Sequence, residues 1–137
     1  MVEYIDREEL KQLIETKNSS FLIVDCRDDD FFTEGGAIST AINVPSETFD
    51  DKITLEKLHS KIKSNNINQV IFHCFKSQFR GPTCAQTYFG YLVDNKINDI
   101  IKVQVLTSGY EMWKSEYSNN PNLINYDLYS IESIPSK

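Results

Sequence analysis

The segment VIFHCFKSQFRGPTCAQTYFGYL, residues 70–92, carries the clearest indication of the fold. It opens on the apolar residues 70–72, a run that is too short for a helix and that predicts a buried strand. Cys74 and Arg80 follow, and Gly81-Pro82 then begin a helix, because proline has no N–H to lose in a first helical turn. The sequence therefore predicts a strand, a seven-residue loop from Cys74 to Arg80, and a helix.

The rest of the chain alternates strands and helices in the same way. Asp6 with Glu9 three residues on forms a capping box for a first helix, and Thr54 caps a second. Short apolar runs that predict strands lie at 21–24, 41–44 and 103–106, and residues 108–113 turn into a last helix. This order predicts an α/β domain with a mostly parallel central sheet flanked by helices. We expect residues 1–117 to form the domain and residues 118–137 an irregular C-terminal tail, packed on it or trailing from it.

The overall composition limits the functions of the chain. Its 137 residues, 40% of them hydrophobic and 25% charged, are typical of one globular domain. A formal net charge of -6 argues against a nucleic-acid binder, because such proteins neutralise phosphates with Lys and Arg. No apolar run approaches the length of a membrane span, and the acidic first residues lack the features of a secretory signal. We expect a cytoplasmic or nuclear protein that binds neither nucleic acid nor membrane.

The three cysteines, Cys26, Cys74 and Cys84, form no recognisable framework. Their number is odd and their spacing matches no zinc ligand set, so neither a disulfide scaffold nor a metal site is expected. Reduced thiols fit the expected compartment. Cys84, two positions after Pro82, is expected to pack in the core.

The position of Cys74 favours a function. Ligands of open parallel sheets bind outside the C-terminal ends of the strands, where this loop is predicted to lie. Backbone N–H groups of such a loop, with the N-terminus of the next helix, form a cradle for anions and favour a thiolate. Arg80 offers a planar fork that suits two oxygens of a tetrahedral oxyanion. Cys74 is therefore the candidate nucleophile, and Arg80 the residue that holds the charge.

The neighbours of these two residues complete the candidate site. His73 is expected to orient the loop by hydrogen bonding, since a thiolate needs no base. The other candidates for the phosphate-binding loop are Phe75, Lys76, Ser77, Gln78, Phe79 and Gly81. The lysine and the glutamine make the predicted mouth neutral to basic, and the two phenylalanines would either stack on a substrate or anchor the loop. No metal ion or other cofactor is required, because Arg80 and backbone amides supply the electrostatic stabilisation.

Three segments resemble landmarks of the rhodanese fold, in the right order and over most of the chain. They are IVDCRDDDFFTEGGAISTAINVP (23–45), VIFHCFKSQFRGP (70–82) and SGYEMW (108–113). The His-Cys-x5-Arg loop followed by Gly-Pro resembles the rhodanese-fold cell-cycle phosphatases, which are dual-specificity tyrosine phosphatases, and the eukaryotic arsenate reductases related to them. The loop of sulfurtransferase rhodaneses is one residue shorter, and a larger loop suits a tetrahedral oxyanion better than a single persulfide sulfur.

The resemblance implies a cysteine-dependent phosphatase. It would hydrolyse phosphotyrosine-type or small aryl phosphate monoesters, on a phosphorylated protein or a small molecule, through a phosphocysteine intermediate. A first alternative is an arsenate reductase with glutathione as co-substrate and glutaredoxin as partner, because arsenate mimics phosphate. A second alternative is a phosphate-binding module without catalysis.

The chain departs from the family's pattern in two places. Phe75 and Phe79 stand where the cell-cycle phosphatases have acidic loop residues, so the substrate preference of those enzymes does not carry over. Ala37 stands where the family commonly has a histidine, a change that is expected to affect packing.

The resemblance also bears on the first of the three segments. The cysteine of the cell-cycle phosphatases that matches Cys26 can form a disulfide with the nucleophile, so a redox partner of Cys74 and a small core residue are both open for Cys26. Asp25 and Arg27 match the family's Asp-x-Arg and are expected to form an ion pair that stabilises the fold.

An acid that protonates the leaving group would accelerate ester cleavage by about 10²–10⁴-fold. Four residues are open for this role, namely Asp28, Asp29, Asp30 and Glu47. His59, on a helix surface, is expected to have no role.

Overall fold

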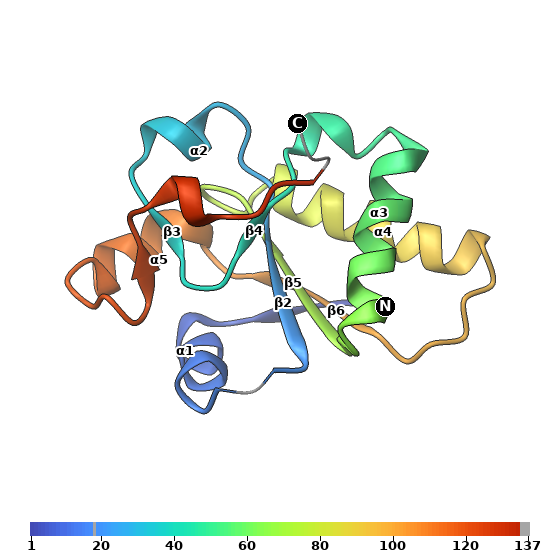
Figure 1. The fold of residues 1–137 in the computed structure, drawn as a ribbon, viewed down its shortest axis with the longest axis horizontal. Helices are drawn as coiled ribbons and strands as arrows, with labels where there is room; N and C mark the ends of the chain where they lie inside the picture. Colours follow the sequence, from blue (N-terminus) through green and yellow to red (C-terminus); the bar gives the residue numbers. More distant parts are fainter. Residues whose placement is uncertain (18, 135–137) are drawn as a thin grey trace.

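A computed structural model describes residues 1–17 and 19–134. A central sheet lies between two layers of helices (Figure 1), which confirms the predicted α/β fold. The helices are α1 (Arg7–Glu15), α2 (Asp30–Thr33), α3 (Lys52–Ser64), α4 (Arg80–Asp94) and α5 (Gly109–Tyr117), with the short 3-10 helices η1 (Ser46–Thr48) and η2 (Leu128–Ser130). The strands are β1 (Val2–Ile5), β2 (Phe21–Asp25), β3 (Ala37–Ile38), β4 (Ile42–Asn43), β5 (Gln69–His73), β6 (Lys102–Leu106) and β7 (Ile124–Asn125).

The central sheet has five strands in the order β1-β6-β5-β2-β4, and every neighbouring pair is parallel. Parallel neighbours are joined by crossovers that return the chain to the starting edge. All five strands therefore end at one edge of the sheet, and the segments that follow β2, β5 and β6 meet there.

Each strand sends alternate side chains to opposite faces, and this divides the core in two. In β2, Leu22 and Val24 join the apolar cluster under α3 and α4, whereas Ile23 joins the cluster under α1 and α5. In β5, Val70 and Phe72 lie on the first face, with Ile71 on the second. Both faces are covered by helices (Figure 1), so a strand of this sheet is an unbroken apolar run in the sequence.

The segment after α5 returns across the domain. β7 pairs antiparallel with β3 in a second small sheet, and Leu123 and Ile124 are buried in the cluster under α1 and α5. Asn43 of β4 then accepts the N–H of Ile134 at 3.0 Å and donates its own N–H to Glu132 at 2.9 Å. Residues 135–137 of the expected tail lie outside the described residues.

Two helix starts test the capping predictions. The Asp6 carboxylate accepts the N–H of Glu9 at 2.8 Å, so the cap of α1 is confirmed. α3 begins earlier than predicted, because the Asp51 carboxylate accepts the N–H of Ile53 at 2.9 Å, and Thr54 is buried inside the helix. Among the described residues, no helix combines the length and the apolar character needed to cross a membrane.

Candidate active site

The loop that carries Cys74 joins the C-terminal end of β5 to the start of α4. β5 ends at His73 and α4 begins at Arg80, so the predicted strand, loop and helix are all present. Cys74 is buried, with 3% of its surface exposed. The nucleophile candidate thus lies at the bottom of the loop, at the edge where the parallel strands end.

Two backbone N–H groups point at the sulfur of Cys74. Ser77 donates from 3.1 Å and Gly81 from 3.3 Å. Ser77 reaches this position in a left-handed conformation, with φ of 54°, and its hydroxyl oxygen accepts the N–H of Cys74 at 3.4 Å. Backbone amides that converge in this way stabilise negative charge, either on a thiolate or on an oxyanion bound beside it.

The start of α5 supports the loop from behind. The N–H of Tyr110 donates to the carbonyl of Cys74 at 3.0 Å, and the N–H of Glu111 donates to the carbonyl of Phe75 at 2.8 Å. In a trans peptide the N–H points away from the carbonyl, so the amides of Phe75 and Lys76 point away from α5. The N–H groups at the start of α5 thus bind carbonyl groups of the loop, and the amides of Phe75 and Lys76 remain available to bind an anion.

Gly109 is required for this contact. Its φ is +62°, and an added Cβ would lie 2.5 Å from the carbonyl oxygen of Phe75 and 2.6 Å from that of Cys74. The SGYEMW segment resembles a landmark of the family, but the sequence did not predict that it supports the loop from behind. The glycine at the start of α5 was the signal that could have indicated such a close approach.

His73 also holds the loop. Its Nδ1 donates to the carbonyl of Cys74 at 3.0 Å, and its ring stacks on that of Tyr110. Burial lowers the pKa of His73, which favours the neutral ring. The geometry agrees with an orienting role for His73, because its ring bonds to the Cys74 carbonyl while the sulfur accepts from Ser77 and Gly81.

Arg80 is held by two carboxylates that follow β2. Asp30 accepts from both terminal nitrogens of Arg80, at 2.8 Å from Nη1 and 2.7 Å from Nη2. Asp28 accepts from Nη1 at 3.3 Å. The hydrogen bond from Arg80 lowers the pKa of Asp30, and the same contact raises the pKa of Arg80. The sequence did not reveal this contact, because α2 and α4 are far apart along the chain.

This arrangement bears on the search for a leaving-group acid. Asp28 and Asp30 both accept hydrogen bonds from Arg80. The lowered pKa of Asp30 makes that carboxylate a poor proton donor. The side chain of Asp29 is exposed, and it has no hydrogen bond among the described residues. Glu47 is exposed too, at the rim of a cavity that reaches Arg80.

Cys26 lies beside Cys74. The pairing of β2 with β5 sets Asp25 opposite His73, and the N–H of Cys26 donates to the carbonyl of His73 at 2.7 Å. Cys26 and Cys74 thus each follow the last residue of one of two adjacent parallel strands. Burial raises the pKa of the Cys26 thiol, and the neighbouring Cys84 adds to the shift. All three thiols are free, and Cys84 packs in the core cluster as expected.

The ion pair between Asp25 and Arg27 is present and fully buried. The Nη2 of Arg27 lies 2.7 Å from Asp25, and both side chains are 0% exposed. Arg27 also donates to the carbonyl of Gly36 at 2.8 Å and lies over the ring of Tyr110 at 4.2 Å. The pair ties β2 to the turn after α2, which agrees with a structural role.

The two loop phenylalanines differ. Phe75 is half buried and packs against the cluster under α1 and α5, so it anchors the loop. Phe79 is 79% exposed beside a cavity of about 490 Å³. The cavity is lined by Ser46, Glu47, Phe49, Asp50, Phe79, Arg80, Thr83, Cys84 and Thr87. Lys76 and Gln78 are exposed.

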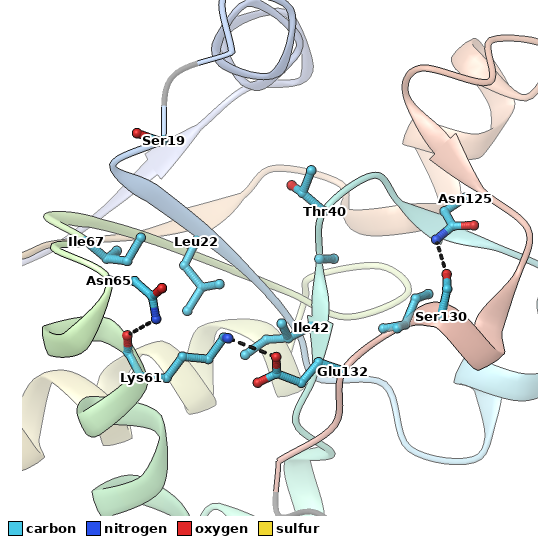
Figure 2. A pocket seen from close by; sticks show the side chains of 12 residues that line it. Ser19, Leu22, Thr40, Ile42, Lys61, Asn65, Ile67, Asn125, Ser130 and Glu132 are labelled. Atoms are coloured by element: carbon cyan, nitrogen blue, oxygen red, sulfur yellow. Dashed lines mark hydrogen bonds and ion pairs between the residues drawn. The ribbon is translucent and has the colours of Figure 1, made fainter.

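Another cavity, of about 470 Å³, lies apart from the loop, between the end of α3, strands β2 and β4 and the C-terminal segment. In Figure 2, Lys61 reaches across it to Glu132, at 2.9 Å, and Asn125 donates to Ser130 at 2.9 Å. The side chains of Lys61 and Glu132 pair with each other, as do those of Asn125 and Ser130, and none of the lining residues comes from the loop, so we assign this cavity no part in the chemistry.

His59, which was expected to have no role, is partly buried on α3. Its Nδ1 lies 3.0 Å from the hydroxyl of Tyr88, and burial lowers its pKa. No group of three or more His, Cys, Asp or Glu side chains in the described parts of the chain could hold a metal ion.

Comparison with known families gives one match over most of the chain. The profile of the rhodanese-like domain matches residues 6–116. A solved structure of Ygr203w from Saccharomyces cerevisiae, described as a homolog of single-domain rhodanese and of the Cdc25 phosphatase catalytic domain, superimposes with a TM-score of 0.81. It is 25% identical, and the match covers 93% of this chain and 90% of that one. The expected rhodanese-like fold is confirmed.

The curated relatives include one named for arsenical resistance and one named as a phosphatase. Arsenical-resistance protein 2 of Saccharomyces cerevisiae is 33% identical over 122 residues, which are 84% of this chain and 90% of that protein. Dual specificity phosphatase Cdc25 of Arabidopsis thaliana is 33% identical over 115 residues, which are 83% of this chain and 74% of that protein.

Proposed function

The chain belongs to the rhodanese-like domain family, and we propose that it is a cysteine-dependent phosphatase with Cys74 as nucleophile. Its substrates would be phosphotyrosine-type or small aryl phosphate monoesters. The observation that carries the proposal is the sulfur of Cys74, which accepts N–H groups of Ser77 and Gly81 inside a loop closed by Arg80.

The proposed reaction uses these groups in two steps. The Cys74 thiolate attacks phosphorus, and an S–P bond forms as the bond to the leaving oxygen breaks. The leaving oxygen takes up a proton, and water then cleaves the S–P bond to release phosphate and regenerate the thiolate. Arg80 and the loop amides hold the non-bridging oxygens throughout, where charge develops.

The size and lining of the neighbouring cavity support an aryl substrate. Its volume of about 490 Å³ lies in the range of small-molecule sites, and Phe79 offers an exposed ring at its edge. The leaving aryl oxide is also a weaker base than an alkoxide, so it departs with less assistance from an acid. This fits a site in which Asp28 and Asp30 are engaged with Arg80.

Hydrolysis of an aryl phosphate by the purified chain tests the proposal. Cys74→Ser should abolish hydrolysis while far-UV circular dichroism and thermal stability stay unchanged. Arg80→Lys, which keeps the charge but loses the fork, should lower kcat/KM by about 10²–10³-fold. Normal hydrolysis by Cys74→Ser would show that the assignment is wrong.

Arsenate reduction is the second candidate. It is favoured by the 33% identity with Arsenical-resistance protein 2 and by the two carboxylates engaged with Arg80, since this reaction needs no acid for an alcohol leaving group. Cys74 would form an adduct with arsenate, and two thiols, one of them from glutathione, would be oxidised to a disulfide as As(V) becomes As(III). Glutaredoxin would then reduce the disulfide.

One preparation assayed for both reactions separates the candidates. Arsenite formation with glutathione and glutaredoxin, with negligible aryl phosphate hydrolysis, would favour the reductase. If neither reaction occurs while phosphate still protects Cys74 from alkylation, the chain is a phosphate-binding module.

A further inference from the structure

The two arginines that follow the active-site strands use their guanidinium groups differently. Arg27 presents Nε and Nη2 to Asp25, with Nε at 3.0 Å and Nη2 at 2.7 Å. Arg80 presents Nη1 and Nη2 to Asp30, and its Nε has no hydrogen bond to any described residue. The Nε and Nη2 side of Arg80, the edge that Arg27 uses for a carboxylate, is therefore open for an anion.

The acidic pair that holds Arg80 is itself fixed. Asp28 accepts the Ser46 hydroxyl at 2.6 Å and the N–H of Glu47 at 3.1 Å, both from η1. Its own N–H donates to the carboxylate of Asp30 at 3.0 Å. Hydrogen bonds to groups other than Arg80 thus hold both carboxylates, and the two together form a fixed binding position for the Arg80 side chain.

We propose, on the basis of the proposed function, that Asp30 and Asp28 are positioning residues for Arg80. They bind its Nη1 and Nη2 atoms and leave its Nε edge free to bind the oxyanion next to Cys74. Asp30 makes the main contact and Asp28 the weaker one. The oxyanion does not need to displace either carboxylate.

The physical reason is preorganisation. An unrestrained arginine has many rotamers, and ordering it on binding costs free energy that reduces affinity. Because the two carboxylates order Arg80 when the protein folds, this entropy is not lost again when the anion binds. The two carboxylates also place negative charge near the anion site. If they instead competed with the anion for Arg80, their removal would strengthen phosphate binding. One measurement therefore decides between the two roles.

The measurement is protection of Cys74 from iodoacetamide by inorganic phosphate. Asp30→Asn should raise the phosphate concentration needed for half protection by about tenfold, although it removes a negative charge. Asp29→Asn is the matched control. It removes the same charge one residue earlier in the chain, and the Asp29 side chain does not contact Arg80. It should change the concentration by less than about twofold. Equal or tighter phosphate binding by Asp30→Asn would overturn the proposal.

A double-mutant cycle tests whether Asp30 acts through Arg80. In an Arg80→Lys background, Asp30→Asn should cause little further loss, because there is no fork left to position. An undiminished loss in that background would overturn the proposal. If Asp30→Asn does not fold, as judged by circular dichroism, Asp28→Asn replaces it in the same assay and cycle, with an expected loss of about threefold.

The wild-type protein separates this proposal from the proposed function. No protection of wild-type Cys74 by phosphate would count against an oxyanion site altogether. Protection of the wild type that Asp30→Asn leaves intact would count against the positioning role alone.

Discussion

The backbone N–H of Tyr110 donates a 3.0 Å hydrogen bond to the carbonyl oxygen of Cys74. This bond, with its neighbour from Glu111 to Phe75, joins the start of α5 to the loop that carries the candidate nucleophile. The loop conformation thus depends on an element that comes later in the chain and contributes no side chain to the sulfur.

Gly109→Ala should therefore damage the loop. The new Cβ would lie 2.5 Å from the carbonyl oxygen of Phe75 at a φ of +62°, so we expect the free energy of unfolding to fall by about 2 kcal/mol or more, with loss of aryl phosphate hydrolysis. Gly90→Ala in α4 is the control, because a Cβ there meets nothing within 4 Å. It should stabilise the protein by about 0.5–1 kcal/mol in urea denaturation. Equal stability of the two variants would contradict this account.

Mild hydrogen peroxide should give a disulfide between Cys26 and Cys74. Oxidation of the Cys74 thiolate to a sulfenic acid, followed by attack of the Cys26 thiol with loss of water, forms the bond, and thiols should reverse it. The adjacent strand positions of the two cysteines support this outcome. Peptide mapping by mass spectrometry is the measurement. A disulfide to Cys84 instead, or only over-oxidised Cys74, would remove Cys26 from the site.

The stability of the protein should fall as the pH drops from about 7 towards 5. Burial lowers the pKa of His73 and of His59, so below the unfolded value of about 6.5 the unfolded chain binds more protons than the folded one. The contribution of the neutral ring is complete above that value and is lost as the pH falls below it. The loss amounts to up to about 1.4 kcal/mol per pH unit for the fully buried His73, and solvent screening makes it smaller for His59. His73→Asn keeps a donor for the Cys74 carbonyl and should flatten the curve of thermal midpoint against pH. A slope that persists in that variant would assign the effect to His59.

Phe79→Ala should raise the KM for an aryl phosphate by about two- to tenfold with little change in kcat, because an exposed ring contributes to binding and not to bond cleavage. The KM for a small alkyl phosphate should not change, which serves as the control. Stability should not change either, since Phe79 is 79% exposed. A lower kcat at constant KM would show instead that Phe79 shapes the loop.

Asp25→Asn should lower the free energy of unfolding by about 3–5 kcal/mol, because it leaves the charge of the fully buried Arg27 without its partner. Urea denaturation gives the value. A loss below about 1 kcal/mol would indicate that water or a neighbouring group compensates for Arg27.

Local patterns were enough to predict much of the fold and part of the site. The apolar runs of β2, β5 and β6, and the Gly81-Pro82 start of α4, are short-range features whose physics does not depend on the rest of the chain. β1 had no such signal, because it lies at the edge of the sheet and only Ile5 among its residues is buried. The cap of α3 was misplaced because Asp51 and Thr54 are both good capping residues and the sequence does not rank them.

The α/β class, the alternation of strands and helices along the chain, and the loop from Cys74 to Arg80 with its glycine and proline follow from the sequence alone. The groups that surround that loop are known only from the folded structure: Asp30 on Arg80, 50 positions away, Tyr110 and Glu111 behind the loop, and Cys26 just after the adjacent strand β2. Local patterns arise from backbone geometry and periodic burial, which act over a few residues. Contacts between distant residues follow from how the helices pack on the sheet, and packing is a property of the whole core.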